Sequence, residues 1–290
     1  MLLIPDLDTF VIYPWDDESG PGGGRVARLI CDVHNPDGTP FDGCPRLCLK
    51  RSIEAAAKLG ITVTNVRGYA TSSVVQHVFA MILHLTRRLD DYNRAAVDGR
   101  WAGSRQFCVL DRTIDDLEGQ RLGVIGYGEL GSAVARTAEC FGMEVLVAQR
   151  QGAPRGTDRL PLEELLPKVD VLTLHCPLTE ETRGLIDGGA LAAMKESAIL
   201  INAARGGIVD EAALAEALRS GRLAGAGVDV LSTEPPRDGN PLLAADIPNL
   251  VVTPHVAWAS RRSRQRLLDG VAENIERFAG GDPINVVTPD

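Results

Sequence analysis

Residues 121–131 read RLGVIGYGELG, and this stretch decides the fold of the chain. A largely apolar run typical of a buried strand leads into a GxGxxG turn, which opens a helical pattern at residues 129–142. A GxGxxG alone is a weak signal, but between a strand and a helix it indicates a dinucleotide site. The three glycines permit a tight turn, close approach of a pyrophosphate and close helix–strand packing. We therefore predict cofactor contacts from Gly126, Gly128, Glu129, Leu130 and Gly131.

Strand and helix patterns alternate from this turn to about residue 260. Further strands are predicted at residues 143–148, 169–175, 198–203, 224–230 and 249–254. Helices are predicted between them at residues 162–166, 189–194 and 210–221. The strand runs are apolar throughout instead of alternating, which is typical of parallel strands covered on both faces. The predicted fold class is therefore α/β, with a doubly wound, Rossmann-like parallel sheet.

Three segments outside this alternation also carry helix and strand signals. Residues 71–95 are predicted to form one long helix opened by a Thr/Ser cap. Residues 52–60 predict a short helix that ends at a glycine, followed by a strand at 61–65. The last helix, at residues 260–279, has apolar side chains at helical spacing and is expected to pack away from the sheet.

Composition and charge exclude several function classes. The 290 residues are 44% hydrophobic and 24% charged, as in a globular protein. The formal net charge of −9 argues against nucleic acid and anionic membranes as partners. The first residues lack the basic start of a signal peptide, and no apolar run is long enough to span a membrane. We therefore predict a cytoplasmic protein.

The six cysteines are scattered along the chain, and cytosolic thiols normally stay reduced. A zinc site can be drawn from Cys31, His34, Cys44 and Cys48, but their spacing matches no common zinc finger. We predict no metal site.

The ribose end of the predicted cofactor site lacks the usual acid. Eighteen residues after Gly131, where an Asp or Glu normally binds the ribose hydroxyls, the chain has Gln149 followed by Arg150. Gln149 can bind a ribose hydroxyl without repelling a 2′-phosphate, and Arg150 can pair with that phosphate. The alternative is an ordinary surface Arg at a strand end. The predicted cofactor is therefore NAD or NADP, with a slight preference for tolerance of NADP.

Three polar side chains, Arg205, Glu234 and His255, follow three of the predicted strands. Ligands of an open α/β sheet bind outside the carboxyl ends of the strands. A His can move a proton near neutral pH, a neighbouring carboxylate raises its pKa, and an Arg can hold a substrate carboxylate. A helix cap, a turn residue and a core His are the structural alternatives, but their joint placement predicts an active site. We interpret His175 as near the cofactor and His77 as structural.

Four motifs resemble those of the D-2-hydroxyacid dehydrogenase family: GVIGYGELG (123–131), INAARGGIVDE (201–211), GAGVDVLSTEPP (225–236) and NLVVTPHVAWAS (249–260). Within this family, residues 76–95 and the TPHVAWAS motif are most similar to the glycerate dehydrogenase, or hydroxypyruvate reductase, branch. The resemblance extends from about Ser52 to the C-terminus.

The resemblance implies a function and roles for individual residues. The reaction would be the NAD(P)-dependent interconversion of a small D-2-hydroxy acid and its 2-oxo acid. Hydroxypyruvate/D-glycerate or glyoxylate/glycolate is the first substrate pair that we expect. Arg205 would hold the substrate, His255 would be the acid/base, and Glu234 would set its pKa. Asp229 would contact the nicotinamide amide. Backbone lining the cofactor cleft would come from Cys176, Pro177, Ala203 and Ala204. A homodimer formed through the cofactor domain and its long helix is also implied.

Departures from the family pattern concentrate at the N-terminal end. Residues 1–50 are rich in Gly, Pro and Asp, with plausible strands only in VIYP and ARLICDV. The family's N-terminal half-domain would contain a small flavodoxin-like sheet and a Gly-containing loop that binds the substrate carboxylate. Here CPRLCLKRSIEAAA runs straight into the helix with no such loop, and the chain is a few dozen residues short. We therefore expect this part to be truncated or atypical.

Two domains are expected: a dinucleotide-binding domain at residues 73–260, and a smaller, incomplete substrate domain from residues 1–72 and 261–290. Trp258 belongs either to the wall of the substrate pocket or to a core. The rival hypothesis is a dinucleotide-binding protein with lost or weak catalysis, either a degenerate paralogue or a redox-sensing interaction module.

Overall fold

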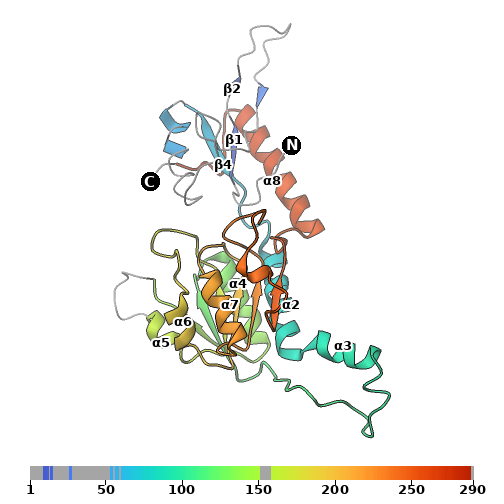
Figure 1. Ribbon diagram of the computed structural model, residues 1–290. Helices are drawn as coiled ribbons and strands as arrows, with labels where there is room; N and C mark the ends of the chain where they lie inside the picture. Colours follow the sequence, from blue (N-terminus) through green and yellow to red (C-terminus); the bar gives the residue numbers. More distant parts are fainter. Residues whose placement is uncertain are drawn as a thin grey trace. The chain divides into compact units, whose positions relative to one another are not determined.

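The computed structural model describes residues 9–12, 14–15, 26–27, 53–54, 56–58, 60–150 and 158–288. The chain divides into two compact units, one formed by Thr71–Ala257 and the other by Met1–Ala70 with Trp258–Asp290 (Figure 1). The segment in which we predicted no Gly loop lies outside the described residues. The four residues of the alternative zinc site lie outside them too.

The unit Thr71–Ala257 contains the predicted doubly wound sheet, and the structure confirms it. Six parallel strands lie in the order β10-β9-β8-β7-β5-β6. They are β5 (Arg121–Ile125), β6 (Glu144–Val147), β7 (Val171–Leu174), β8 (Ile199–Asn202), β9 (Gly225–Val228) and β10 (Leu250–Val252). The first of these strands, β5, lies between β6 and β7, so the winding reverses there. The ligand crevice of such a sheet lies at this switch point.

The central strands of the sheet are buried, as expected for apolar strands that helices cover on both faces. All residues of β7, β8 and β9 are buried, as are the last four of β5. Helices flank the strands in Figure 1. They are α2 (Thr71–Arg87), α4 (Glu129–Cys140), α5 (Leu162–Leu165), α6 (Gly188–Ala193) and α7 (Glu211–Arg219). Helix α2 contacts α4, β8 and β9, whereas α6 contacts α7 and α7 contacts the short 3-10 helix η1 (Pro241–Leu243).

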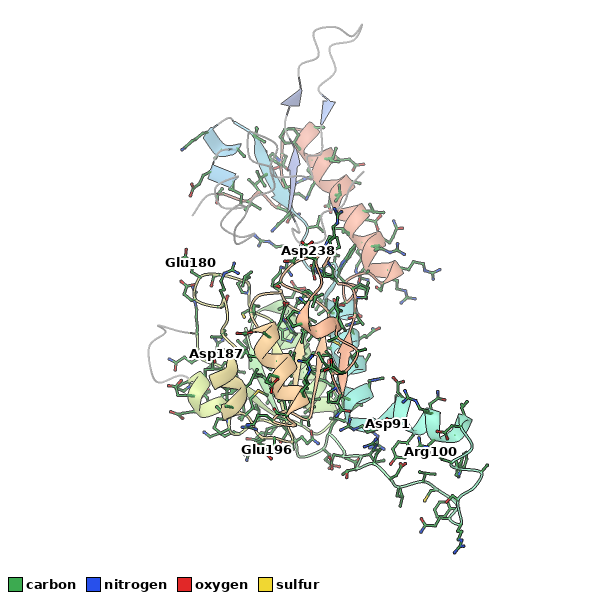
Figure 2. The ribbon with its side chains drawn as sticks, viewed as in Figure 1. Asp91, Arg100, Glu180, Asp187, Glu196 and Asp238 are labelled. Atoms are coloured by element: carbon green, nitrogen blue, oxygen red, sulfur yellow. The ribbon has the colours of Figure 1, made fainter. Side chains whose placement is uncertain are left out.

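Helices α6 and α7 each begin with an aspartate as the N-cap residue. The Asp187 carboxylate, labelled in Figure 2, accepts a hydrogen bond from Ala190 N at 2.8 Å and starts α6. The Asp210 carboxylate accepts one from Ala213 N at 3.0 Å and starts α7. Such caps satisfy backbone N–H groups that a helix start leaves without a partner. The cap of α7 places Glu211 in the first turn, facing the loop after β9.

The long helix predicted at residues 71–95 is two helices. Arg88 adopts the left-handed conformation, with φ of 52°, and separates α2 from α3 (Leu89–Val97). Helix α2 buries six apolar side chains, but α3 buries only Ala95, so the chain leaves the core where its apolar stripe ends. Arg88 also donates a hydrogen bond to Asn249, in the turn before β10. No Gly or Pro marks this break in the sequence.

The other unit contains two short antiparallel pairs and the last helix. β1 (Thr9–Ile12) pairs with β4 (Thr62–Asn65), and β2 (Pro14–Trp15) pairs with β3 (Val26–Ala27). α8 (Arg261–Ala279) starts after Ser260, whose hydroxyl accepts a hydrogen bond from Ser263 N at 3.2 Å.

Trp258 packs in this second unit. Its ring meets Tyr69 edge-on with centroids 6.3 Å apart, against a buried cluster that includes Val66 and Leu267. This placement favours the core alternative for Trp258. In the described part of the chain, no helix has the length and apolar character to cross a membrane.

Candidate active site

The glycine loop after β5 makes two close backbone contacts. Gly126 has a φ of 90°, and a Cβ there would lie 2.5 Å from Cys176 N and 2.6 Å from His175 O. A Cβ on Gly131 would lie 2.0 Å from Gly126 O. Backbone atoms cannot yield as a flexible side chain can, so both positions require glycine. The loop therefore packs against the end of β7, at the switch point of the sheet.

Gly128 differs because its surroundings are open. It is the N-cap of α4, its φ is −87°, and a Cβ built there would meet nothing within 4 Å. The first backbone N–H groups of a helix have no partner within the helix, and the helix start favours negative charge. Open space at a helix start beside a glycine loop fits the pyrophosphate of a dinucleotide. The Glu129 carboxylate, in the first turn of α4, accepts a hydrogen bond from Thr71 Oγ1.

Two partly buried titratable side chains lie next to this loop, and their surroundings favour the uncharged forms. Burial lowers the pKa of the His175 imidazole to about 4 and raises the pKa of the Cys176 thiol to about 11. His175 Nε2 lies 2.9 Å from Thr173 Oγ1, on β7. At neutral pH, neither group places a charge beside the expected phosphates.

The chain after β6 carries the residues predicted at the ribose. Gln149 is half-buried, and its N–H donates to Leu160 O at 2.7 Å, while Arg150 is exposed. A second cation, Arg159, has its guanidinium carbon 5.8 Å from the ring centroid of Tyr127, in the glycine loop. Sequence reasoning missed Arg159 because it lies ten residues beyond the position where a ribose ligand is normally sought.

Arg205 follows β8 in a turn closed by Asn202. The Asn202 side chain is 1% exposed; its Oδ1 accepts from Ala204 N at 3.1 Å, and its Nδ2 donates to Arg205 O at 3.0 Å. Arg205 Nη1 donates to Ala204 O at 2.7 Å. Asn202 therefore fixes the backbone at Ala203 and Ala204, which were predicted to line the cofactor cleft.

The Arg205 turn lies directly against the loop that carries Glu234. A Cβ on Gly206 would lie 1.8 Å from Leu231 O and 2.5 Å from Ser232 N. Ser232 is held in turn by Glu211 of α7, whose carboxylate accepts from Ser232 N and Ser232 Oγ, both at 2.6 Å. Two adjacent strand-end loops are therefore packed backbone to backbone.

Glu234 and His255 form a close pair. His255 Nδ1 lies 2.7 Å from Glu234 Oε2, and their side chains are 16% and 22% exposed, respectively. The other oxygen, Glu234 Oε1, accepts a hydrogen bond from Leu231 N at 2.8 Å. The carboxylate thus holds one ring nitrogen, so a proton transferred to or from a substrate would be carried by His255 Nε2.

His255 itself has a φ of 53°, in the left-handed region that a non-glycine residue rarely adopts. Its N–H donates to Asp229 O at 2.8 Å and to Thr253 O at 3.0 Å. The Asp229 carboxylate, 1% exposed, accepts hydrogen bonds from Val256 N and Ala257 N, both at 2.9 Å. Strained backbone persists only where the surroundings hold it, and it concentrates at functional sites. The contact of Asp229 with a nicotinamide amide stays a prediction.

The arrangement brings together most of what the sequence predicted. The Glu234–His255 pair lies beside the Arg205 turn at the carboxyl end of the sheet, and the glycine loop lies at the switch point. A cation, a carboxylate–imidazole pair and a dinucleotide loop suit proton transfer coupled to hydride transfer. Among the described residues, no group of three or more potential metal-binding side chains occurs.

Residues 79–257 match the family model described as D-isomer specific 2-hydroxyacid dehydrogenase, NAD binding domain. The chain belongs to this family.

Individual relatives of this dehydrogenase are similar over most of its length. It is 49% identical over 238 residues to the glycerate dehydrogenase of Methylorubrum extorquens, covering 81% of this chain and 74% of the relative. A crystal structure of a protein from Thermus thermophilus has a TM-score of 0.72 and 42% identity, covering 81% of this chain and 74% of that one. The NADPH-dependent glyoxylate/hydroxypyruvate reductase of Sinorhizobium meliloti, solved with NADP and malonate, has a TM-score of 0.70 and 32% identity, with 86% and 75% covered.

Sequence reasoning missed two residues that position the site of this dehydrogenase. Asn202 and Glu211 touch the loops that carry Arg205 and Glu234. Both occur in the INAARGGIVDE motif, where a polar residue at a strand end and an acid in the first turn of a helix were available signals. His77 was interpreted as structural, and its ring contacts Thr253, in the turn that carries His255.

Proposed function

We propose that this protein catalyses the NAD(P)-dependent interconversion of a small D-2-hydroxy acid and its 2-oxo acid, with hydroxypyruvate/D-glycerate first and glyoxylate/glycolate next. The observation that carries the proposal is the 2.7 Å contact between Glu234 and His255 beside the Arg205 turn, within a domain of the NAD-binding class. The substrate names come from the relatives, which include a glycerate dehydrogenase and a hydroxypyruvate reductase.

Each residue has a defined task in this mechanism. NAD(P)H, when bound, supplies the hydride. Arg205 binds the substrate carboxylate and polarises the reacting carbonyl, because a guanidinium can donate to both. His255 Nε2 delivers a proton to the carbonyl oxygen, and Glu234 holds Nδ1 and stabilises the charged ring. In the oxidative direction, His255 removes the hydroxyl proton.

The cofactor would be held by the glycine loop and the residues around it. Gly126, Gly128 and the start of α4 would receive the pyrophosphate, and Gln149 and Arg150 the ribose. We also propose that the unit Thr71–Ala257 is the cofactor domain and the other unit the substrate domain. A cytoplasmic location remains a prediction from the sequence.

A spectrophotometric assay tests the proposal. With hydroxypyruvate or glyoxylate, the purified protein is expected to oxidise NADH or NADPH well above the rate without substrate. Because Arg150 can pair with a 2′-phosphate and Gln149 does not repel it, kcat/KM with NADPH is expected within about tenfold of that with NADH. A much larger preference for NADH would remove Arg150 from cofactor binding. Cofactor binding without turnover of any 2-oxo acid would favour the rival hypothesis of a dinucleotide-binding protein.

We also propose a homodimer formed through the α3 arm, residues 89–118. Six large apolar side chains are exposed there: Leu89, Val97, Trp101, Phe107, Leu110 and Ile114. The arm has internal contacts, because Trp101 Nε1 donates to Phe107 O at 2.8 Å. Arg100 lies between Asp98 and Asp111, and Asp91 and Arg100 are labelled on this arm in Figure 2. Exposed apolar groups concentrated on one arm favour a protein interface, and a second copy is the partner that the family suggests.

The oligomeric state can be measured by light scattering. The chain mass is 31.0 kDa, and the wild type is expected at about twice this value. Replacing Phe107, 91% exposed, and Leu110, 74% exposed, by serine is expected to shift the mass to that of one chain. The matched control is Leu243→Ser, which removes an exposed leucine from η1. A double variant that keeps the wild-type mass would contradict the proposed interface.

A further inference from the structure

Helix α2 contacts the His255 turn through two side chains on one face. Ser73 Oγ donates to Ala257 O at 2.6 Å, and His77 Nε2 lies 2.9 Å from Thr253 Oγ1. Residues four apart in a helix project to the same side. Ser73 and His77 therefore reach the last and the first residue of the turn 253–257, with the left-handed His255 between them.

The hydrogen bond from Thr253 to Asp229 shows that His77 is the donor in its own contact with Thr253. The Thr253 hydroxyl donates to Asp229 Oδ1 at 2.5 Å, so its proton is committed and its oxygen accepts from His77 Nε2–H. His77 Nε2 also lies 3.5 Å from Asp229 Oδ1. A chain of bonds thus runs from His77 through Thr253 to the buried Asp229 carboxylate.

Asp229 connects this chain to His255. Its carboxylate accepts from Val256 N and Ala257 N, and its backbone oxygen accepts from His255 N. These bonds fix the backbone on both sides of His255, which would otherwise leave its rarely populated conformation. If the turn relaxed, Nδ1 would move away from Glu234 and the ring would lose its orientation.

We infer that His77 is a positioning residue: through Thr253 and Asp229 it holds the His255 turn in the left-handed conformation that keeps the imidazole on Glu234. This inference rests on the proposed function for its kinetic consequence, because His255 is the proton carrier only in that reaction. Its structural consequence, the order of the turn 253–257, does not depend on turnover.

The test compares three substitutions on α2. His77→Leu removes the donor, His77→Gln keeps an N–H donor at similar reach, and His84→Leu removes a histidine seven residues along the same helix, outside the network. For His77→Leu, kcat is expected to fall about 10- to 100-fold, because small displacements of a reacting group are costly. KM for the 2-oxo acid and the dissociation constant of NADH are expected within about twofold of the wild type. His77→Gln is expected to restore kcat to within about threefold, and His84→Leu to match the wild type.

Hydrogen exchange at the amides of Val256 and Ala257 gives a readout independent of activity. Exchange is expected to accelerate at least about tenfold in His77→Leu and to stay near the wild-type rate in the other two variants. Unchanged exchange and kcat in His77→Leu would overturn the inference. An inactive wild type would refute the proposed function while leaving this exchange comparison decisive for the network.

A second pair of variants covers the case in which His77→Leu does not fold. Thr253→Val has nearly the same shape but lacks the hydroxyl that links His77 to Asp229, whereas Thr253→Ser keeps it. Faster exchange and lower kcat in the valine variant, restored by serine, are the expected result. Equal exchange rates and equal kcat in the two variants would overturn the inference, because the Thr253 hydroxyl would then not help to position His255.

Discussion

Replacing His255 by alanine is expected to lower kcat for hydroxypyruvate reduction by about 10²- to 10⁴-fold, the usual contribution of a positioned acid or base. The substitution removes the group proposed to deliver a proton to the carbonyl oxygen. The dissociation constant of NADH is expected to change less than about twofold, because the proposed phosphate contacts lie at the glycine loop. Stopped-flow turnover and fluorescence titration of NADH measure the two quantities.

Glu234→Gln is the informative companion to this variant. Glutamine keeps the shape, but it has a single acceptor oxygen for the two donors, Leu231 N–H and His255 Nδ1–H, and no charge to stabilise a protonated ring. Its kcat is expected to lie between those of the wild type and His255→Ala. Turnover by His255→Ala at the wild-type rate would remove His255 from the mechanism.

Alanine at Gly131 and at Gly128 is expected to cause two different failures. At Gly131 the new methyl would lie 2.0 Å from Gly126 O, and the free energy of unfolding is expected to fall by about 3 kcal/mol or more, as for severe overpacking. At Gly128 the methyl meets no protein atom within 4 Å and φ is negative, so stability is expected to change by less than about 1 kcal/mol. The same methyl would occupy the expected pyrophosphate space and weaken NADH binding at least about tenfold.

Thermal unfolding without cofactor and titration with NADH separate these outcomes. Gly128→Ala serves as the control for Gly131→Ala, because both add one methyl group to the same GxGxxG segment. A Gly128→Ala protein that binds NADH as tightly as the wild type would place the pyrophosphate elsewhere. A Gly131→Ala protein with wild-type stability would mean that α4 moves away from Gly126 at little cost.

The sheet could be predicted because most residues of each strand are apolar and turn residues separate the strands. β7, β8 and β9 are buried throughout, and no polar alternation blurs the strand signal. The division between α2 and α3 could not be predicted. It depends on the end of the apolar stripe and on the bond from Arg88 to Asn249, a partner 161 residues away that local propensity does not contain.

The charged side chains of the candidate site could be predicted from the sequence, but the residues that hold their loops in place could not. Arg205, Glu234 and His255 stand at strand ends, where topology alone brings them to one edge. Asn202 holds the backbone of its own turn, whereas Glu211 and His77 reach Ser232 and Thr253 in distant loops. The last two contacts exist only after folding. The left-handed conformation of His255 likewise has no signal in its residue type.

The contact of Gly206 with the Leu231 carbonyl limits how this enzyme can diversify. Loops at a sheet edge normally tolerate insertions and deletions. Here an added residue in either loop would separate the guanidinium from the carboxylate–imidazole pair, because the two backbones touch. Functional variants are therefore expected to keep both loops at constant length, and changes in substrate choice must arise in other segments of the chain.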